Sequence, residues 1–160
     1  MSERDTFIKM ALSAWQMQIS RFNQLLDKLS DEQLLADTAP GRNSGKYILG
    51  HLTAVHDNLL QQLELGNKLY PELDAVFISS PDKSGLETPE LPALKQYWNT
   101  VNDTLWEHFE ALAPESWFSR HALISEEDFA KEPYRNKLNI VINRAGHVAY
   151  HLGQMVYLKQ

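Results

Sequence analysis

The residues best suited to chemistry are two histidines near the end of the chain, His147 and His151, in the stretch HVAYHLGQ. Residues four apart on an α-helix lie on the same face, so both imidazoles can reach one metal ion. A zinc protease would need a glutamate directly after the first histidine as its general base, and residue 148 is a valine. Many helices carry such pairs on a solvated face, so the spacing predicts a metal site only with a further ligand nearby.

A row of polar residues extends along the same face of this otherwise apolar helix. Its members are Asn139, Asn143, His147, His151 and Gln154. Buried polar groups are costly without partners, and a metal ion with its surrounding hydrogen bonds would be one partner. We interpret Asn143 and Gln154 as residues that orient the ligands or the substrate. Tyr150 is a third candidate for that role, although we favour a core tyrosine with a hydrogen-bonded hydroxyl.

A third histidine, His51, belongs to another predicted helix, where apolar residues flank it on the inward face. A lone histidine in such a position is more often a hydrogen-bonded core residue, but here it can complete a three-histidine site. His56 is five residues further on, about 140° around the helix, and is not expected to be a ligand. His108 and His121 have no comparable partners, and we interpret both as surface residues. Glycines precede two of the three ligands, at Gly50 and Gly146, where they allow a close approach or simply local packing.

Four segments that repeat apolar residues at a helical period must position these histidines. They cover residues 8–29, about 47–65, from 88 or 92 to the proline at 114, and from the proline at 133 almost to the end. The last has apolar residues around much of its circumference, which predicts a largely buried helix.

The connections between these segments complete the prediction. Ser30 followed by Gln33 is typical of a capping box before a short helical turn, and a second turn is expected near residues 125–131. Residues 67–88 break all periodicity, with an extended piece considered at 75–79, so this segment is expected to cross the bundle. The sequence therefore predicts one all-α domain over residues 1–160, a four-helix bundle with a long crossover between its second and third helices.

Composition excludes several classes of function. The chain has no cysteine, so it has no disulfide, thiolate ligand or cysteine nucleophile, and any thiol in the chemistry must be a small molecule. Fifteen basic residues against 21 acidic ones give a net charge of -6, and no helix carries a basic stripe, so nucleic-acid binding is not expected. The chain has no apolar run that could cross a membrane and no apolar leader, so we expect a cytoplasmic protein.

In the order of its helices and in two motifs, ILGHLTAVHDNLL and HVAYHLGQ, the chain resembles the DinB/YfiT-like superfamily of metal-binding four-helix bundles. The resemblance covers nearly the whole chain. It implies that His51, His147 and His151 bind one divalent ion, most often zinc or nickel, with open positions left for water. It also implies a small-molecule substrate and a homodimer. Characterised relatives include thiol-dependent transferases and a thiol-dependent isomerase, and others are regarded as metal-dependent hydrolases.

Three neutral imidazoles would leave the full charge of the ion available to polarise a bound water or thiol. No carboxylate lies three or four residues from any of the three histidines, so no general base is predicted. We expect a metal-dependent enzyme that activates a thiol or water, with thiol-dependent S-transfer to a small electrophile as the favoured reaction. The alternatives are a non-catalytic metal-binding or dimerising bundle and a metal-dependent hydrolase. Imidazoles alone suit zinc, nickel, copper or iron about equally.

Overall fold

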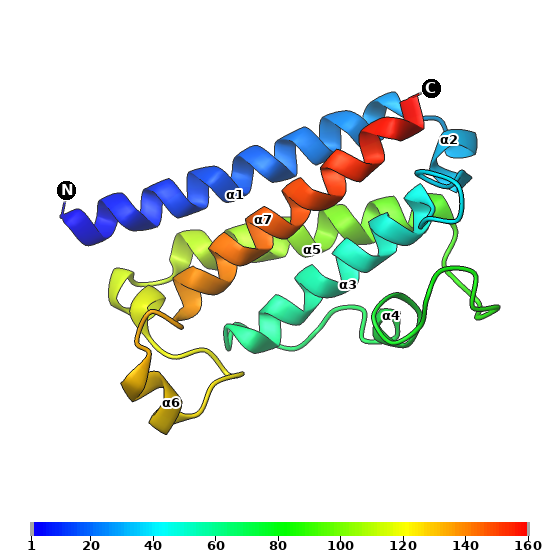
Figure 1. Cartoon of the computed structure of the whole chain (residues 1–160). Helices are drawn as coiled ribbons and strands as arrows, with labels where there is room; N and C mark the ends of the chain where they lie inside the picture. The colour runs from blue at the N-terminus through cyan, green and yellow to red at the C-terminus, as the bar shows by residue number, and fades with distance from the viewer. Residues whose placement is uncertain (1, 160) are drawn as a thin grey trace.

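The computed structural model describes residues 2–159, and over these residues the chain is all-helical with no strand (Figure 1). The all-α prediction is confirmed. The long helices are α1 (Glu3–Lys28), α3 (Gly45–Gln62), α5 (Leu91–Ala111) and α7 (Lys137–Met155). Shorter ones are α2 (Asp31–Leu35), α4 (Leu73–Phe77), α6 (Glu126–Lys131) and the 3-10 turns η1 (Pro114–Phe118) and η2 (Val156–Lys159). In the described part of the chain, no helix has both the length and the apolar character needed to cross a bilayer.

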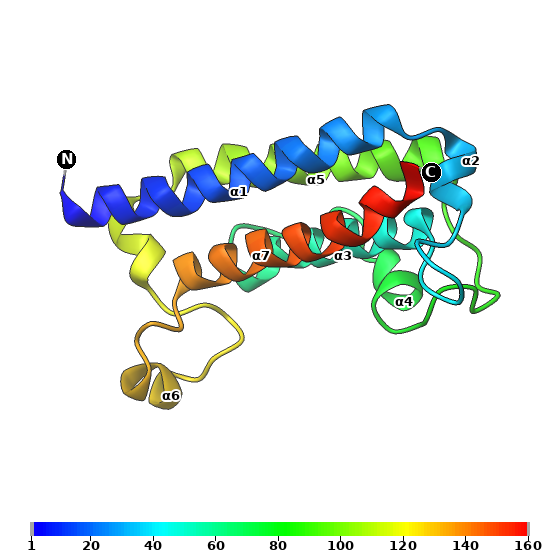
Figure 2. The same ribbon diagram turned by 45° about the horizontal axis from the view of Figure 1, so that its top comes forward.

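The direction of the long helices explains the length of the segment between α3 and α5. Helices α1 and α7 run in one direction, and α3 and α5 both run in the other (Figures 1 and 2). Helix α1 packs mainly against α7, and α3 packs mainly against α5. Because α3 and α5 are parallel, residues 63–90 return along the molecule before α5 begins, and α4 lies within that return (Figure 1).

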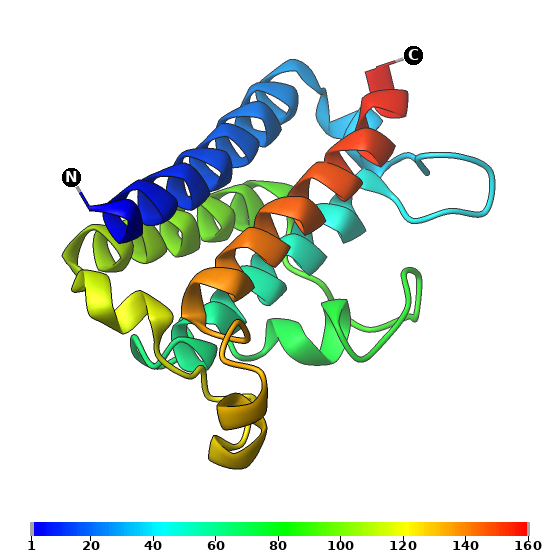
Figure 3. The ribbon, with the colours of Figure 1, turned by 60° about the vertical axis from the view of Figure 1, so that its left-hand side comes forward.

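The helices begin at polar caps that the sequence indicates. Ser30 accepts a hydrogen bond from the backbone of Gln33, whose side chain accepts one from the backbone of Ser30, which confirms the predicted capping box. Ser44 caps α3, so this helix starts at Gly45. It ends at Gln62, and both ends lie a little earlier in the chain than predicted. The C-terminal turn η2 lies beside α2 at the far end of the molecule from residue 2 (Figure 3).

The core is aromatic at its centre. Trp15 of α1 and Trp98 of α5 are both buried. The ring of His56 in α3 lies against both, with its centroid 4.6 Å from that of Trp15 and 5.0 Å from that of Trp98. Of the 19 residues of α7, eight are buried and five are exposed, so the prediction of a largely buried helix overstates its burial. One side of α7 is open to solvent, although the helix packs against α1, α3 and the turns η1 and η2. Its exposed residues are Ile142, Asn143, Gly146, Tyr150 and Gly153.

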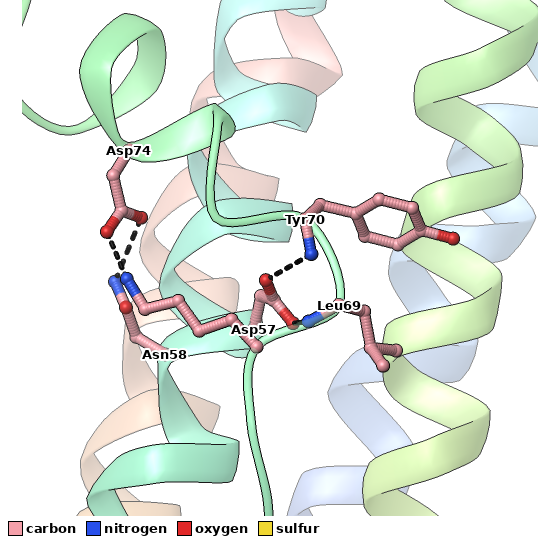
Figure 4. A network of polar contacts seen from close by, with 6 residues as sticks. Asp57, Asn58, Leu69, Tyr70 and Asp74 are labelled. Atoms are coloured by element: carbon pink, nitrogen blue, oxygen red, sulfur yellow. Dashed lines mark hydrogen bonds and ion pairs between the residues drawn. The ribbon is translucent and has the colours of Figure 1, made fainter.

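The irregular chain after α3 is fastened to that helix by carboxylates (Figure 4). Asp57 of α3 is buried and accepts hydrogen bonds from the backbone N–H groups of Leu69 and Tyr70, each at 2.8 Å. Burial raises the pKa of Asp57, while these two hydrogen bonds oppose the rise. Asp74 accepts from Asn58 at 3.4 Å and pairs with a lysine of the same segment. The stretch 75–79 is not extended, since residues 75–77 belong to α4.

Candidate metal centre

Three imidazoles from two helices meet at one point between α3 and α7. The Nε2 atom of His147 lies 3.3 Å from Nε2 of His51 and 3.0 Å from Nε2 of His151. One nitrogen from each of the three rings lies within 4.8 Å of the others. Zinc binds imidazole nitrogen at about 2.0–2.1 Å, and two nitrogens at a tetrahedral angle around it would be about 3.3 Å apart. The spacing of the rings therefore fits a single ion.

Hydrogen bonds on the far side of two rings aim their Nε2 lone pairs at this point. Nδ1 of His51 donates to the backbone carbonyl of Phe77 in α4 at 2.7 Å, and a carbonyl can only accept. Nδ1 of His151 contacts Oε1 of Gln154 at 2.8 Å and donates to it. A neutral imidazole with Nδ1 protonated has its lone pair on Nε2, the form that binds metal. Nδ1 of His147 is buried and has no hydrogen-bond partner within residues 2–159.

The surroundings of His147 and His151 favour the uncharged form of both rings. Burial, together with the nearby His151, His51 and Arg144, lowers the pKa of His147 to about 4. Burial also lowers the pKa of His151, although its hydrogen bond to Gln154 acts in the opposite direction. Metal ions bind neutral imidazole, so a lowered pKa prepares these ligands at neutral pH.

The glycine before His51 allows the backbone of α4 to reach that ring. A Cβ atom built on Gly50 would lie 2.6 Å from Cδ1 of the Phe77 ring and still closer to two other ring atoms. Phe77 is buried, and its carbonyl holds Nδ1 of His51. Tyr47, one turn earlier on α3, stacks on His51 with the centroids 6.2 Å apart and the planes at 9°. Gly146 differs, since nothing lies within 4 Å of an added Cβ.

The residues predicted to assist the ligands lie at different distances from them. Gln154 contacts His151 directly. Tyr150 is 63% exposed, so the interpretation as a core tyrosine is wrong; its ring meets His151 edge-on at 5.1 Å and its hydroxyl accepts from Gln154 at 3.3 Å. Asn143 is exposed, and within residues 2–159 no hydrogen bond joins its side chain to a histidine.

The other histidines lie outside the cluster. His56 is fully buried and faces away, and its Nδ1 lies 2.8 Å from Oδ1 of Asn102. The interpretation of His121 as a surface residue is wrong, because it is 7% exposed and its Nδ1 accepts from the backbone of Leu123 at 3.1 Å. His108 is partly exposed.

Two neighbours of the cluster are absent from the sequence interpretation. The Phe77 carbonyl lies at the end of α4, and a backbone contact of this kind has no sequence signal. Arg144 does have a sequence signal, because it lies three residues before His147 and therefore on the same face of α7.

The family model of the DinB superfamily matches residues 14–155, nearly the whole chain. The chain belongs to the DinB superfamily. No curated protein matches it.

Proposed function

We propose that this protein is a metal-dependent enzyme that binds one divalent ion through His51, His147 and His151 and activates a thiol for transfer to a small electrophile. The observation that carries the proposal is the convergence of three Nε2 atoms, two of them with Nδ1 hydrogen-bonded elsewhere. A DinB-type four-helix bundle with a crossover between its second and third members is the frame of the proposal. Zinc or nickel is the ion that we expect.

The bound ion would supply Lewis acidity, which lowers the pKa of a thiol or of water. Histidine is a neutral metal ligand, so three of them would leave the positive charge of the ion uncompensated. Structural zinc is usually coordinated by four protein ligands, whereas the cluster contains three candidate ligands within residues 2–159. Three protein ligands leave room for a reacting molecule, which supports an active rather than a structural site.

In the proposed reaction the sulfur of a low-molecular-weight thiol forms a bond to the electrophilic carbon, and the leaving group departs with its bonding electrons. The thiol proton goes to solvent, since His147, with its pKa of about 4, is a weak base. The chain itself holds no cysteine, so the thiol is a second substrate. Gln154 and the Phe77 carbonyl hold the ligand rings in place during the reaction.

A hollow beside the cluster is the place that we propose for part of the substrate. It has a volume of about 340 Å³ and is formed by α3, α4 and the segment that leads to α5. Tyr47 and Phe77 line it, and both contact His51. Residues between 76 and 88 form one wall of this hollow.

A homodimer is a further part of the proposal. It is supported by an exposed apolar row on α1 formed by Phe7, Met10 and Met17. Their spacing of three and seven residues places them on one side of the helix. Light scattering of the purified protein, and of Met10→Glu, would test whether this row joins two copies.

Metal analysis followed by an activity screen tests the main proposal. Purified protein should bind one zinc or nickel ion per chain, and His147→Ala should lose it. His108→Ala, on the partly exposed side of α5, is the matched control and should keep the ion. The loaded protein should transfer low-molecular-weight thiols to electrophiles such as alkyl halides or epoxides.

Two results would contradict parts of this proposal separately. Wild-type protein that holds no divalent ion, even when zinc or nickel is added, would remove the metal centre. A loaded protein that hydrolyses test esters or amides without any thiol would instead favour the hydrolase alternative.

A further inference from the structure

A half-buried arginine next to the histidines has no ion-pair partner among residues 2–159. Arg144 lies on α7 three residues before His147, on the same face of the helix. Its Nε atom is buried and has no hydrogen bond within residues 2–159. None of the ion pairs in that range includes it, and no other arginine or lysine there has a buried nitrogen without a hydrogen bond.

The two carboxylates that hold the following segment to α3, Asp57 and Asp74, are already engaged. Asp57 accepts from the backbone of the segment after α3, and Asp74 from Asn58 and a lysine (Figure 4). Arg144 lies one turn before His147 on α7, so its side chain lies close to the cluster. Burial lowers the pKa of Arg144 itself, and no carboxylate raises it.

The side of α3 that carries His51 is partly open. Along it, every third or fourth residue is partly exposed, and these residues are His51, Val55, Asn58 and Gln62. Oε1 of Gln62 is also buried without a hydrogen-bond partner in residues 2–159. The boundary between α3 and α7 therefore continues from the histidines as a strip that contains unsatisfied polar atoms.

We propose that Arg144 forms an anion-binding subsite beside the three histidines, and that the substrate carries a carboxylate or phosphate group there. A buried charge without a partner is strongly unfavourable, and a guanidinium binds carboxylate or phosphate through two parallel hydrogen bonds. A divalent ion next to Arg144 would make this spot strongly positive in a protein whose net charge is -6, which favours an anionic ligand. The inference rests on the proposed function for the role of that anion as part of a substrate.

Anion binding to metal-free protein tests the subsite without any activity. Calorimetric titration with inorganic phosphate and, separately, with acetate should show binding to the wild type. Arg144→Gln should weaken the binding of the preferred anion about tenfold or more, as expected for the loss of a charged hydrogen bond. Arg21→Gln, which removes an exposed arginine of α1, is the matched control and should bind as the wild type does.

The two titrations also define the substrate class, because stronger binding of acetate indicates a carboxylate and stronger binding of phosphate a phosphate ester. Either preference, when lost in Arg144→Gln, supports the proposal. Wild-type protein that binds neither anion, or an Arg144→Gln variant that binds them equally well, would overturn it.

A second variant separates a ligand-binding arginine from a structural one. Arg144→Met keeps the aliphatic bulk but removes the uncompensated charge, so the melting temperature of metal-free protein without anion should rise. A lower melting temperature would mean that the guanidinium already has a partner in the fold, and would overturn the proposal. Metal content of Arg144→Gln should equal that of the wild type, so failure of the subsite and failure of the metal centre are distinguishable.

Discussion

Replacing Gly50 by alanine should disturb the candidate metal centre without changing any of its three histidines. The new Cβ would lie 2.6 Å from Cδ1 of Phe77 and closer to two more ring atoms, whereas carbon atoms in favourable contact are about 3.5–4.0 Å apart. The ring must therefore move by about 1 Å. Phe77 is 1% exposed and enclosed by the core, so the movement is resisted on every side. Overpacking of this kind costs about 1–3 kcal/mol of folding stability.

The same movement should weaken metal binding, because the backbone of Phe77 holds Nδ1 of His51 at 2.7 Å. Loss of a hydrogen bond that orients a histidine ligand typically lowers metal affinity roughly 10–100-fold. We therefore expect Gly50→Ala to show both a lower urea midpoint and a weaker zinc affinity.

Gly146→Ala is the matched control, since Gly146 also precedes a ligand histidine in a helix but has open space around the added methyl group. It should stabilise the protein by up to about 1 kcal/mol through helix propensity and leave zinc affinity unchanged. Urea denaturation of metal-free protein and competition titration with a chromophoric chelator measure both quantities. If the two alanine variants behave alike, the argument about Gly50, Phe77 and His51 is refuted.

Three further predictions concern the support of the site and the core. Gln154→Ala should weaken zinc binding roughly 10–100-fold, measured by the same competition, because His151 loses the acceptor that fixes its ring; an unchanged affinity would refute this role. Asp57→Asn should cost about 1–3 kcal/mol in urea denaturation, because one of two backbone N–H groups loses its acceptor; a variant as stable as the wild type would contradict it. Burial lowers the pKa of His56 to about 3 from its ordinary 6.5, so between these values the unfolded chain binds a proton that the folded chain does not, and stability should fall as the pH falls through this window. In His56→Gln the slope of the unfolding free energy against pH should decrease by up to about 1.4 kcal/mol per pH unit, and a slope equal to that of the wild type would count against a buried neutral His56.

The sequence predicts the two ligands on α7 because their spacing follows from helix geometry, and it predicts His51 because apolar neighbours fix its angular position. The groups that hold the three histidines in place are harder to predict from the sequence. Gln154 can be predicted because it is three residues from His151 on the same helix. The contact of the Phe77 carbonyl cannot, because it depends on how the segment after α3 folds back over that helix. The prediction of a core Tyr150 is wrong because apolar composition does not reveal which side of a helix faces solvent. His121 was misjudged because its loop lies over the end of α3, where the backbone of Ala122 donates to Gln62.

The histidine cluster also joins distant parts of the chain, since residues 51 and 147 are separated by 96 positions. In a chain without cysteine, an ion held there would act as a removable cross-link between α3 and α7, comparable in loop length to a long-range disulfide. Because the ion would bind the folded state and not the unfolded chain, resistance to proteolysis would follow the free metal concentration. The availability of metal in the surroundings would then set the lifetime of this protein as well as its chemistry.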